Sequence, residues 1–168
     1  DGINWTPNYT VGGITRGEVS SIAGLVFGNG IFVAVGSYCK DIPSDPIPVV
    51  ACHGKIFTSP DGQNWTDRTP GTIQELTLNP LLGVAYGNGI FVAVGDGGTI
   101  LTSIDGSNWA GGSSGATTYL KDVTYGNGTF LAVGVGGPLL DPGPGEHCHR
   151  RPSGPREEHA SLAQLSAR

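Results

Sequence analysis

The chain has 168 residues, enough for one domain, and 29 of them are glycine and 12 proline. Only 14% are charged, against about 25% in an average soluble protein, which argues against a helical bundle or coiled coil. The net charge of −5 argues against a nucleic acid or anionic membrane as partner, and no apolar run is long enough for membrane insertion.

One apolar segment occurs three times along the chain. Residues 24–36 read GLVFGNGIFVAVG, residues 83–95 read GVAYGNGIFVAVG, and residues 122–134 read DVTYGNGTFLAVG. Asn-Gly accepts the positive φ angles of a tight hairpin turn. Each copy therefore predicts two antiparallel strands joined at its GNG centre.

The middle copy and the residues after it predict four short strands. The first includes Val84–Tyr86, the second is Ile90–Val94, the third is Thr99–Ser103, and the fourth begins near Trp109. Four antiparallel strands in a repeat of about 40 to 45 residues are typical of a β-propeller blade. We expect an all-β fold, an incomplete β-propeller of four-stranded antiparallel blades over residues 1–140, followed by a disordered tail over residues 141–168.

A second motif alternates with the apolar one. It reads TSPDGQNW at residues 58–65 and TSIDGSNW at residues 102–109, and the chain itself opens with DGINW. A short aspartate can accept hydrogen bonds from backbone N–H groups just downstream, and glycine gives the turn its backbone freedom. The predicted turn residues are Ser59, Asp61, Gly62 and Trp65 in the first motif, and Ser103, Asp105, Gly106 and Trp109 in the second.

The repeated aspartates have two interpretations. They could be catalytic groups or calcium ligands, or they could hold the turn of each blade. A catalytic group occurs once per site, whereas these occur once per repeat, which favours the structural role.

With these motifs the chain resembles the Asp-box (BNR-like) propeller repeats of sialidases, other glycosidases and many secreted non-enzymatic propellers. It is also similar to the propellers of photosystem II assembly factors. The likeness covers residues 1 to about 140, although Asp and Gly are adjacent here and one residue separates them in the common Asp-box. In that family the Asp-box is a structural turn remote from the active site, so the resemblance implies no catalytic residue.

An insertion at residues 37–54 separates the first apolar segment from the first Asp motif. Cys39 and Cys52 lie near the ends of this loop, whose stems should be paired strands, so a disulfide is expected in an oxidising compartment; two unpaired cytosolic thiols are the alternative. Loops on rigid scaffolds often carry binding residues. The candidates here are Tyr38, Lys40, Asp41 and His53.

The C-terminal tail departs from the repeat after Gly137. We expect at most a weak helical turn near Ala160–Leu165. His147, Cys148, His149 and His159 do not have metal-ligand spacing. No metal or other cofactor is therefore predicted.

A closed propeller needs about four to eight blades. The chain is expected to be part of a larger propeller whose remaining blades belong to a longer chain, or else to close by assembling with other chains. Its predicted function is that of a secreted or cell-envelope scaffold without catalytic residues, binding a protein or carbohydrate partner through its loops. The alternatives are a fragment of a sialidase-like glycoside hydrolase, with its catalytic residues in missing blades, and an assembly chaperone.

Overall fold

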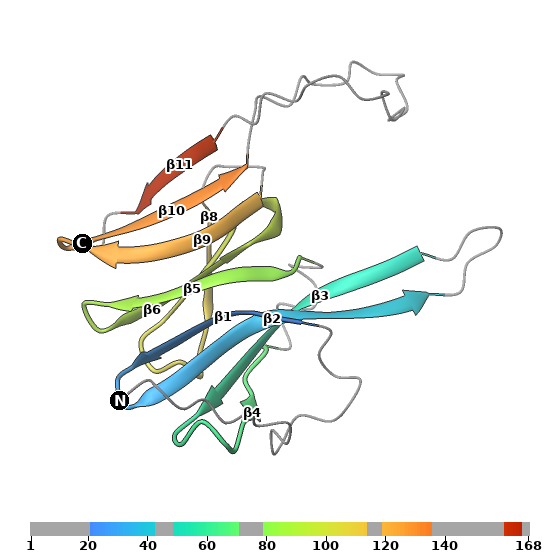
Figure 1. Cartoon of the computed structure of the whole chain (residues 1–168), viewed down its shortest axis with the longest axis horizontal. Coiled ribbons are helices and arrows are strands. Elements are labelled where there is room, and N and C mark those ends of the chain that lie inside the picture. Colours follow the sequence, from blue (N-terminus) through green and yellow to red (C-terminus); the bar gives the residue numbers. More distant parts are fainter. Residues whose placement is uncertain (1–20, 43–48, 71–78, 114–118, 136–159, 166–168) are drawn as a thin grey trace, which may run out of the picture.

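A computed structural model describes residues 21–42, 49–70, 79–113, 119–135 and 160–165 of the chain (Figure 1). The described strands form three antiparallel sheets, which we call blades 1, 2 and 3 in chain order. The expected all-β architecture of antiparallel propeller blades is confirmed, with four strands in each of two sheets and three described strands in the third. Within the described ranges, no helix has the length and apolar character needed to cross a membrane.

Blade 1 has the strand order β1-β2-β3-β4. Its strands are β1 (Ser21–Gly28), β2 (Ile31–Ile42), β3 (Val49–Ser59) and the short β4 (Thr66–Asp67). Strands β2 and β3 stay paired as far as Ile42 opposite Val49. Most of the 37–54 insertion is thus a continuous hairpin that projects beyond the blades (Figure 1), rather than a loop on short stems.

Blade 2 has the order β5-β6-β7-β8 and lies between the other two blades (Figure 1). Its strands are β5 (Leu81–Gly87), β6 (Ile90–Gly95), β7 (Thr99–Ser103) and β8 (Ala110–Ser113), with a 3₁₀ turn at Asp96–Gly98 between β6 and β7. These are the four strands predicted from the repeat, extended by one to three residues at some ends.

Blade 3 contains β9 (Tyr119–Gly126), β10 (Thr129–Val135) and β11 (Ala160–Leu165) in that order. The expected helical turn near Ala160–Leu165 is wrong, because these residues form β11, antiparallel to β10. The outer edge of β10 offers N–H and C=O groups to any extended segment, and β11 pairs with them. The rest of the predicted tail, and the predicted boundary near residue 140, lie outside the described residues.

The three GNG turns have the same backbone geometry. The asparagines Asn29, Asn88 and Asn127 have φ of 49°, 48° and 49°, and the glycines that follow them have φ of 78°, 76° and 77°. Two successive residues at positive φ form the tight turn whose twist matches paired strands. The turns therefore fix the same register at the tip of each hairpin.

The blades stack face to face. We call the face of blade 1 that bears Leu25 and Phe27 its front, the opposite face its back, and we name the equivalent faces of the other blades in the same way. The back of blade 1 contributes Val33, Val35 and Ile56 to one core cluster, and the front of blade 2 completes it with residues such as Phe91. A second cluster joins the back of blade 2 to the front of blade 3.

Candidate functional site

The first Asp motif forms a turn that its own side chains close. Asp61 Oδ1 accepts hydrogen bonds from the backbone N–H groups of Gln63 and Asn64, both at 2.8 Å, and from Ser59 Oγ at 2.9 Å. Ser59 Oγ in turn accepts the backbone N–H of Gly62 at 2.8 Å. Gly62 has φ of 73°, a conformation that glycine adopts without strain.

The second motif repeats this geometry. Asp105 Oδ1 accepts the backbone N–H groups of Ser107 and Asn108 at 2.8 Å and the hydroxyl of Ser103 at 3.0 Å. Gly106 has φ of 70° and donates its N–H to Ser103 Oγ at 2.8 Å. Ser59 and Ser103 are buried, so both turns are anchored in the interior of their blades.

The hydrogen bonds also keep both carboxylates ionised. Backbone N–H donation, first from Asn64 to Asp61 and from Asn108 to Asp105, lowers the pKa of each aspartate far below its ordinary value. A general acid needs a pKa near its working pH, so this environment suits a turn and not proton transfer. The two aspartates are not gathered around a common site but hold separate turns.

Sequence reasoning missed the two asparagines of these turns. Asn64 Nδ2 donates to Asp61 Oδ2 at 2.9 Å, and Asn108 Nδ2 donates to Asp105 Oδ2 at 2.7 Å. The sequence does contain a signal for these two asparagines, since asparagine precedes tryptophan in both motifs and again in DGINW at the start of the chain.

The tryptophans are held by the same turns. Trp65 Nε1 donates to the carbonyl of Gly62 at 3.2 Å, and Trp109 Nε1 donates to the carbonyl of Gly106 at 2.9 Å. Trp109 also packs on the cluster between blades 1 and 2, with its ring centroid 6.5 Å from that of Phe91.

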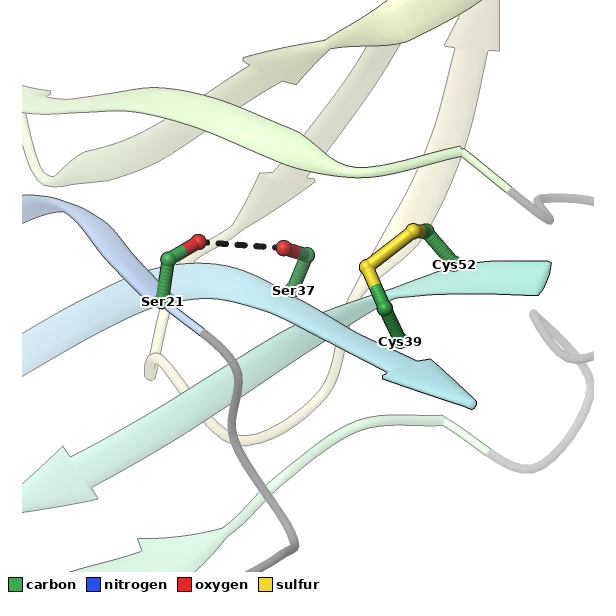
Figure 2. Close-up of a disulfide and its surroundings, with 4 residues drawn as sticks. All are labelled: Ser21, Ser37, Cys39 and Cys52. Atoms are coloured by element: carbon green, nitrogen blue, oxygen red, sulfur yellow. Dashed lines mark hydrogen bonds between the residues drawn. A yellow bond between two sulfur atoms is a disulfide. The ribbon is translucent and has the colours of Figure 1, made fainter. Parts of the chain in front are cut away.

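Cys39 and Cys52 form a disulfide across the projecting hairpin (Figure 2). They lie directly opposite each other on β2 and β3, with Cα atoms 4.0 Å apart. Near the base of the hairpin, the hydroxyls of Ser21 and Ser37 are hydrogen-bonded at 3.1 Å and tie β1 to β2 (Figure 2). The Ser21–Ser37 hydrogen bond and the Cys39–Cys52 disulfide thus hold the hairpin at two successive positions along its length.

The four binding candidates of the insertion are distributed over both strands of this hairpin. Tyr38 lies opposite His53, while Lys40 and Asp41 occupy backbone positions nearer the tip. The side chains of Tyr38 and His53 are half-buried, and His53 Nδ1 is buried without a hydrogen-bond partner.

A groove that the sequence did not reveal lies between the outer parts of blades 1 and 2. It has a volume of about 550 Å³, with residues 67–70 of blade 1 on one wall and residues 107–110 of blade 2 on the other. Its lining includes the charged residue Arg68, the amide residue Asn108 and the aromatic residue Trp109. The combination of an aromatic ring with several hydrogen-bonding groups is typical of sites for small polar ligands.

Hydrogen bonds fix the blade 1 wall of the groove. Asp67 forms an ion pair with Lys55 at 2.7 Å and accepts the N–H of Thr69 at 2.7 Å. Burial raises the pKa of Asp67, but the hydrogen bonds from Lys55 and Thr69 outweigh this effect and lower it overall. Arg68 donates its backbone N–H to the carbonyl of Ile56 and its Nε to Thr58 Oγ1. The wall is therefore preformed.

The histidines of the C-terminal tail lie outside the described residues. Within the described part of the chain, no three His, Cys, Asp or Glu side chains are grouped closely enough to hold a metal ion.

No protein-family model matches this chain, and no curated protein matches it by sequence. Among solved structures, it is similar to the GH32 beta-fructofuranosidase BmSUC1 of Bombyx mori, with a TM-score of 0.45 and 15% identity over 73% of this chain. A mutant of the same enzyme in complex with sucrose gives a TM-score of 0.45 and 13% identity over 73% of this chain. The chain spans 30% and 31% of the length of those two chains.

Proposed function

We propose that the chain is a rigid propeller scaffold of the Asp-box type, which binds a carbohydrate ligand without transforming it. The observation that carries the proposal is the groove between blades 1 and 2, which presents Arg68, Asn108 and Trp109 on preformed walls. Sugar hydroxyls hydrogen-bond to guanidinium and amide groups, and an indole ring offers apolar contact to the C–H face of a sugar ring.

The Asp turns support a role in binding. The carboxylate of Asp105 accepts hydrogen bonds from Ser107 and Asn108, which belong to the groove wall at residues 107–110. A wall ordered in advance loses less entropy when a ligand binds. In this account Asp105 is a positioning residue, and the contacts to the ligand come from the groove.

A glycan array followed by calorimetry on the best ligand tests the proposal. Replacing Arg68 with alanine should weaken binding about tenfold or more, because a hydrogen bond to a charged group is worth about 1.5–3 kcal/mol. Lys121→Ala is the matched control, since it removes an exposed positive charge on β9, outside the groove. Equal effects of the two variants, or the absence of any glycan ligand, would contradict the proposal.

The same experiment distinguishes the other candidates from the sequence. Turnover of a chromogenic glycoside would favour a part of a glycoside hydrolase, and co-purification with a membrane-protein intermediate would favour an assembly chaperone. Binding to a protein and to no glycan would retain the scaffold but change its ligand. A secreted or cell-envelope location is part of the proposal, because the Cys39–Cys52 disulfide persists in oxidising compartments.

A further inference from the structure

The sequence contains four Asn-x-Thr tripeptides, the acceptor motif for N-linked glycosylation in secreted proteins. They begin at Asn4, Asn8, Asn64 and Asn127. The first two lie outside the described residues. The other two have different structural settings, and this difference separates a candidate modification site from a motif that the fold already uses.

Asn64 is committed to the first Asp turn. Its Nδ2 donates a hydrogen bond to Asp61 Oδ2 at 2.9 Å. Trp65, the middle residue of the tripeptide, is half-buried and donates its indole N–H to the carbonyl of Gly62. An asparagine that carries a sugar has a single N–H left on its amide nitrogen. A glycan on Asn64 would therefore compete with the hydrogen bond that holds the turn.

Asn127 begins the tight turn at the tip of the blade 3 hairpin. The residue is exposed, and no hydrogen-bond partner for its side-chain amide lies in the described part of the chain. Its φ of 49°, followed by 77° at Gly128, makes the turn with the backbone alone. A Cβ built on Gly128 meets no atom within 4 Å. The turn therefore leaves room at its tip for a large polar group on the Asn127 amide.

The exposure of this tip does not depend on what stands beside blade 3. Blade 2 packs against a blade on each of its faces, and Asn88 and Gly89 at its hairpin tip are nevertheless exposed. Asn29 and Gly30 of blade 1 are exposed as well. The tips lie outside the packed faces, so a further blade next to blade 3 would leave Asn127 accessible.

Thr129 distinguishes the blade 3 turn from the two that share its geometry. It is the first residue of β10, whereas Ile31 and Ile90 are the first residues of β2 and β6. Both isoleucines pack against a core cluster. The threonine hydroxyl completes the acceptor motif at Asn127, and the other two turns lack it. The chain thus contains two matched turns without the motif.

We propose that Asn127 is an N-glycosylation site, modified when the chain passes through a secretory compartment, a location that belongs to the function proposed above. The co-substrate is an oligosaccharide joined to a lipid through a diphosphate. A bond forms between Asn127 Nδ2 and the anomeric carbon of the first sugar, and the bond between that carbon and the diphosphate oxygen breaks. The lipid diphosphate leaves with the bonding electron pair, and the amide nitrogen loses one proton to water.

The glycan lies at the end of the blades opposite the projecting hairpin. The turn that carries Asn127 joins β9 to β10 at one end of blade 3, and the hairpin of blade 1 extends from the other end (Figure 1). A bulky, hydrated carbohydrate at Asn127 therefore leaves the disulfide-linked hairpin uncovered.

Mass spectrometry of the chain secreted from eukaryotic cells tests the proposal. Trypsin releases residues 122–150, in which Asn127 is the only asparagine. This peptide should carry a glycan, and enzymatic removal of N-linked glycans in water labelled with heavy oxygen should leave a labelled aspartate at that position. Asn29 and Asn88 are the controls for spontaneous deamidation at Asn-Gly, because they share the turn and lack the threonine.

Two variants at Thr129 separate the motif from the fold. Thr129→Ala should abolish the glycan and Thr129→Ser should retain it, and both keep the asparagine and glycine that form the turn. Thr129 does not line the groove between blades 1 and 2, so neither variant should change ligand binding there. Failure of the modification is thus distinguishable from failure of the proposed binding function.

An unmodified 122–150 peptide from the secreted wild type overturns the proposal. A glycan that persists on this peptide in Thr129→Ala also overturns it. The tryptic peptide 56–68 contains Asn64 as its only asparagine, and higher occupancy there than at Asn127 would show that the turn geometry does not select the site.

Discussion

The ring of Tyr125 lies so close to Gly87 that no side chain fits between them, although the two residues are on different blades. The same relationship holds between Tyr86 and Gly28 one blade earlier. Close approach of an aromatic ring to backbone brings the sheets into contact at the end that carries the GNG turns. Glycine at this position is therefore a requirement of blade stacking, in addition to any role in the turn.

Gly87→Ala should destabilise the fold. The added methyl group would overlap Tyr125 at Cγ, the base of the ring, so rotation of the ring about the Cβ–Cγ bond does not relieve the clash. Overpacking of this kind costs about 1–3 kcal/mol or more. Urea denaturation measures the change in unfolding free energy.

Gly111→Ala in β8 is the matched control for this variant. A Cβ at Gly111 meets no atom within 4 Å, and Gly111 does not have a positive φ. This substitution should leave stability unchanged or raise it by about 0.4–1 kcal/mol, through the unfolded state. Equal destabilisation by both alanines would contradict the stacking described here.

Acid should destabilise the chain through its Asp turns. The pKa of Asp61 and of Asp105 is lower in the folded state than the value of 3.8 expected without the turn. The unfolded chain therefore takes up protons first, and the stabilisation present above about pH 4 is lost as the pH falls toward the folded-state pKa values. Urea denaturation at a series of pH values measures this loss.

Asp105→Asn should be less stable at neutral pH and should lose less stability on acidification than the wild type. Added salt serves as the control, because hydrogen bonds cause the shift and are screened far less than exposed charges. If the variant and the wild type had the same pH dependence, Asp105 would not hold its turn in the way described.

Reduction should weaken the projecting hairpin. The disulfide joins residues 13 apart, and closing a loop of about 15 residues in the unfolded chain is worth about 3 kcal/mol in the chain-entropy description. The double variant Cys39→Ser, Cys52→Ser should be less stable than the wild type by up to this amount. Reductant should destabilise the wild type and not the double variant; a wild type insensitive to reductant would contradict the disulfide.

The repeated parts of the fold were predictable from the sequence. The GNG centre predicts its hairpin because Asn88 and Gly89 accept the φ angles that the turn requires. The Asp motif predicts its turn because Asp61 reaches backbone N–H groups only a few residues away. Both are local interactions, and each occurs more than once along the chain.

Features that depend on distant parts of the chain were not predictable. Strand β11 forms because the edge of β10 is available to pair with it. The sequence of Ala160–Leu165 contains no pattern that predicts this pairing. The groove requires Arg68 of blade 1 and Trp109 of blade 2 to come together across a blade junction. The sequence contains no signal for such a meeting, because it arises from the stacking of whole sheets.

A double-mutant cycle on Gly87 and Tyr125 tests the stacking of the blades most directly. Gly87→Ala and Tyr125→Ala are measured singly and together by urea denaturation. If the ring lies on the glycine, its removal relieves the clash, and the two changes should couple by about 0.5–3 kcal/mol. Additivity to within about 0.3–0.5 kcal/mol would mean that the two residues do not touch, and it would contradict the stacked arrangement of blades 2 and 3.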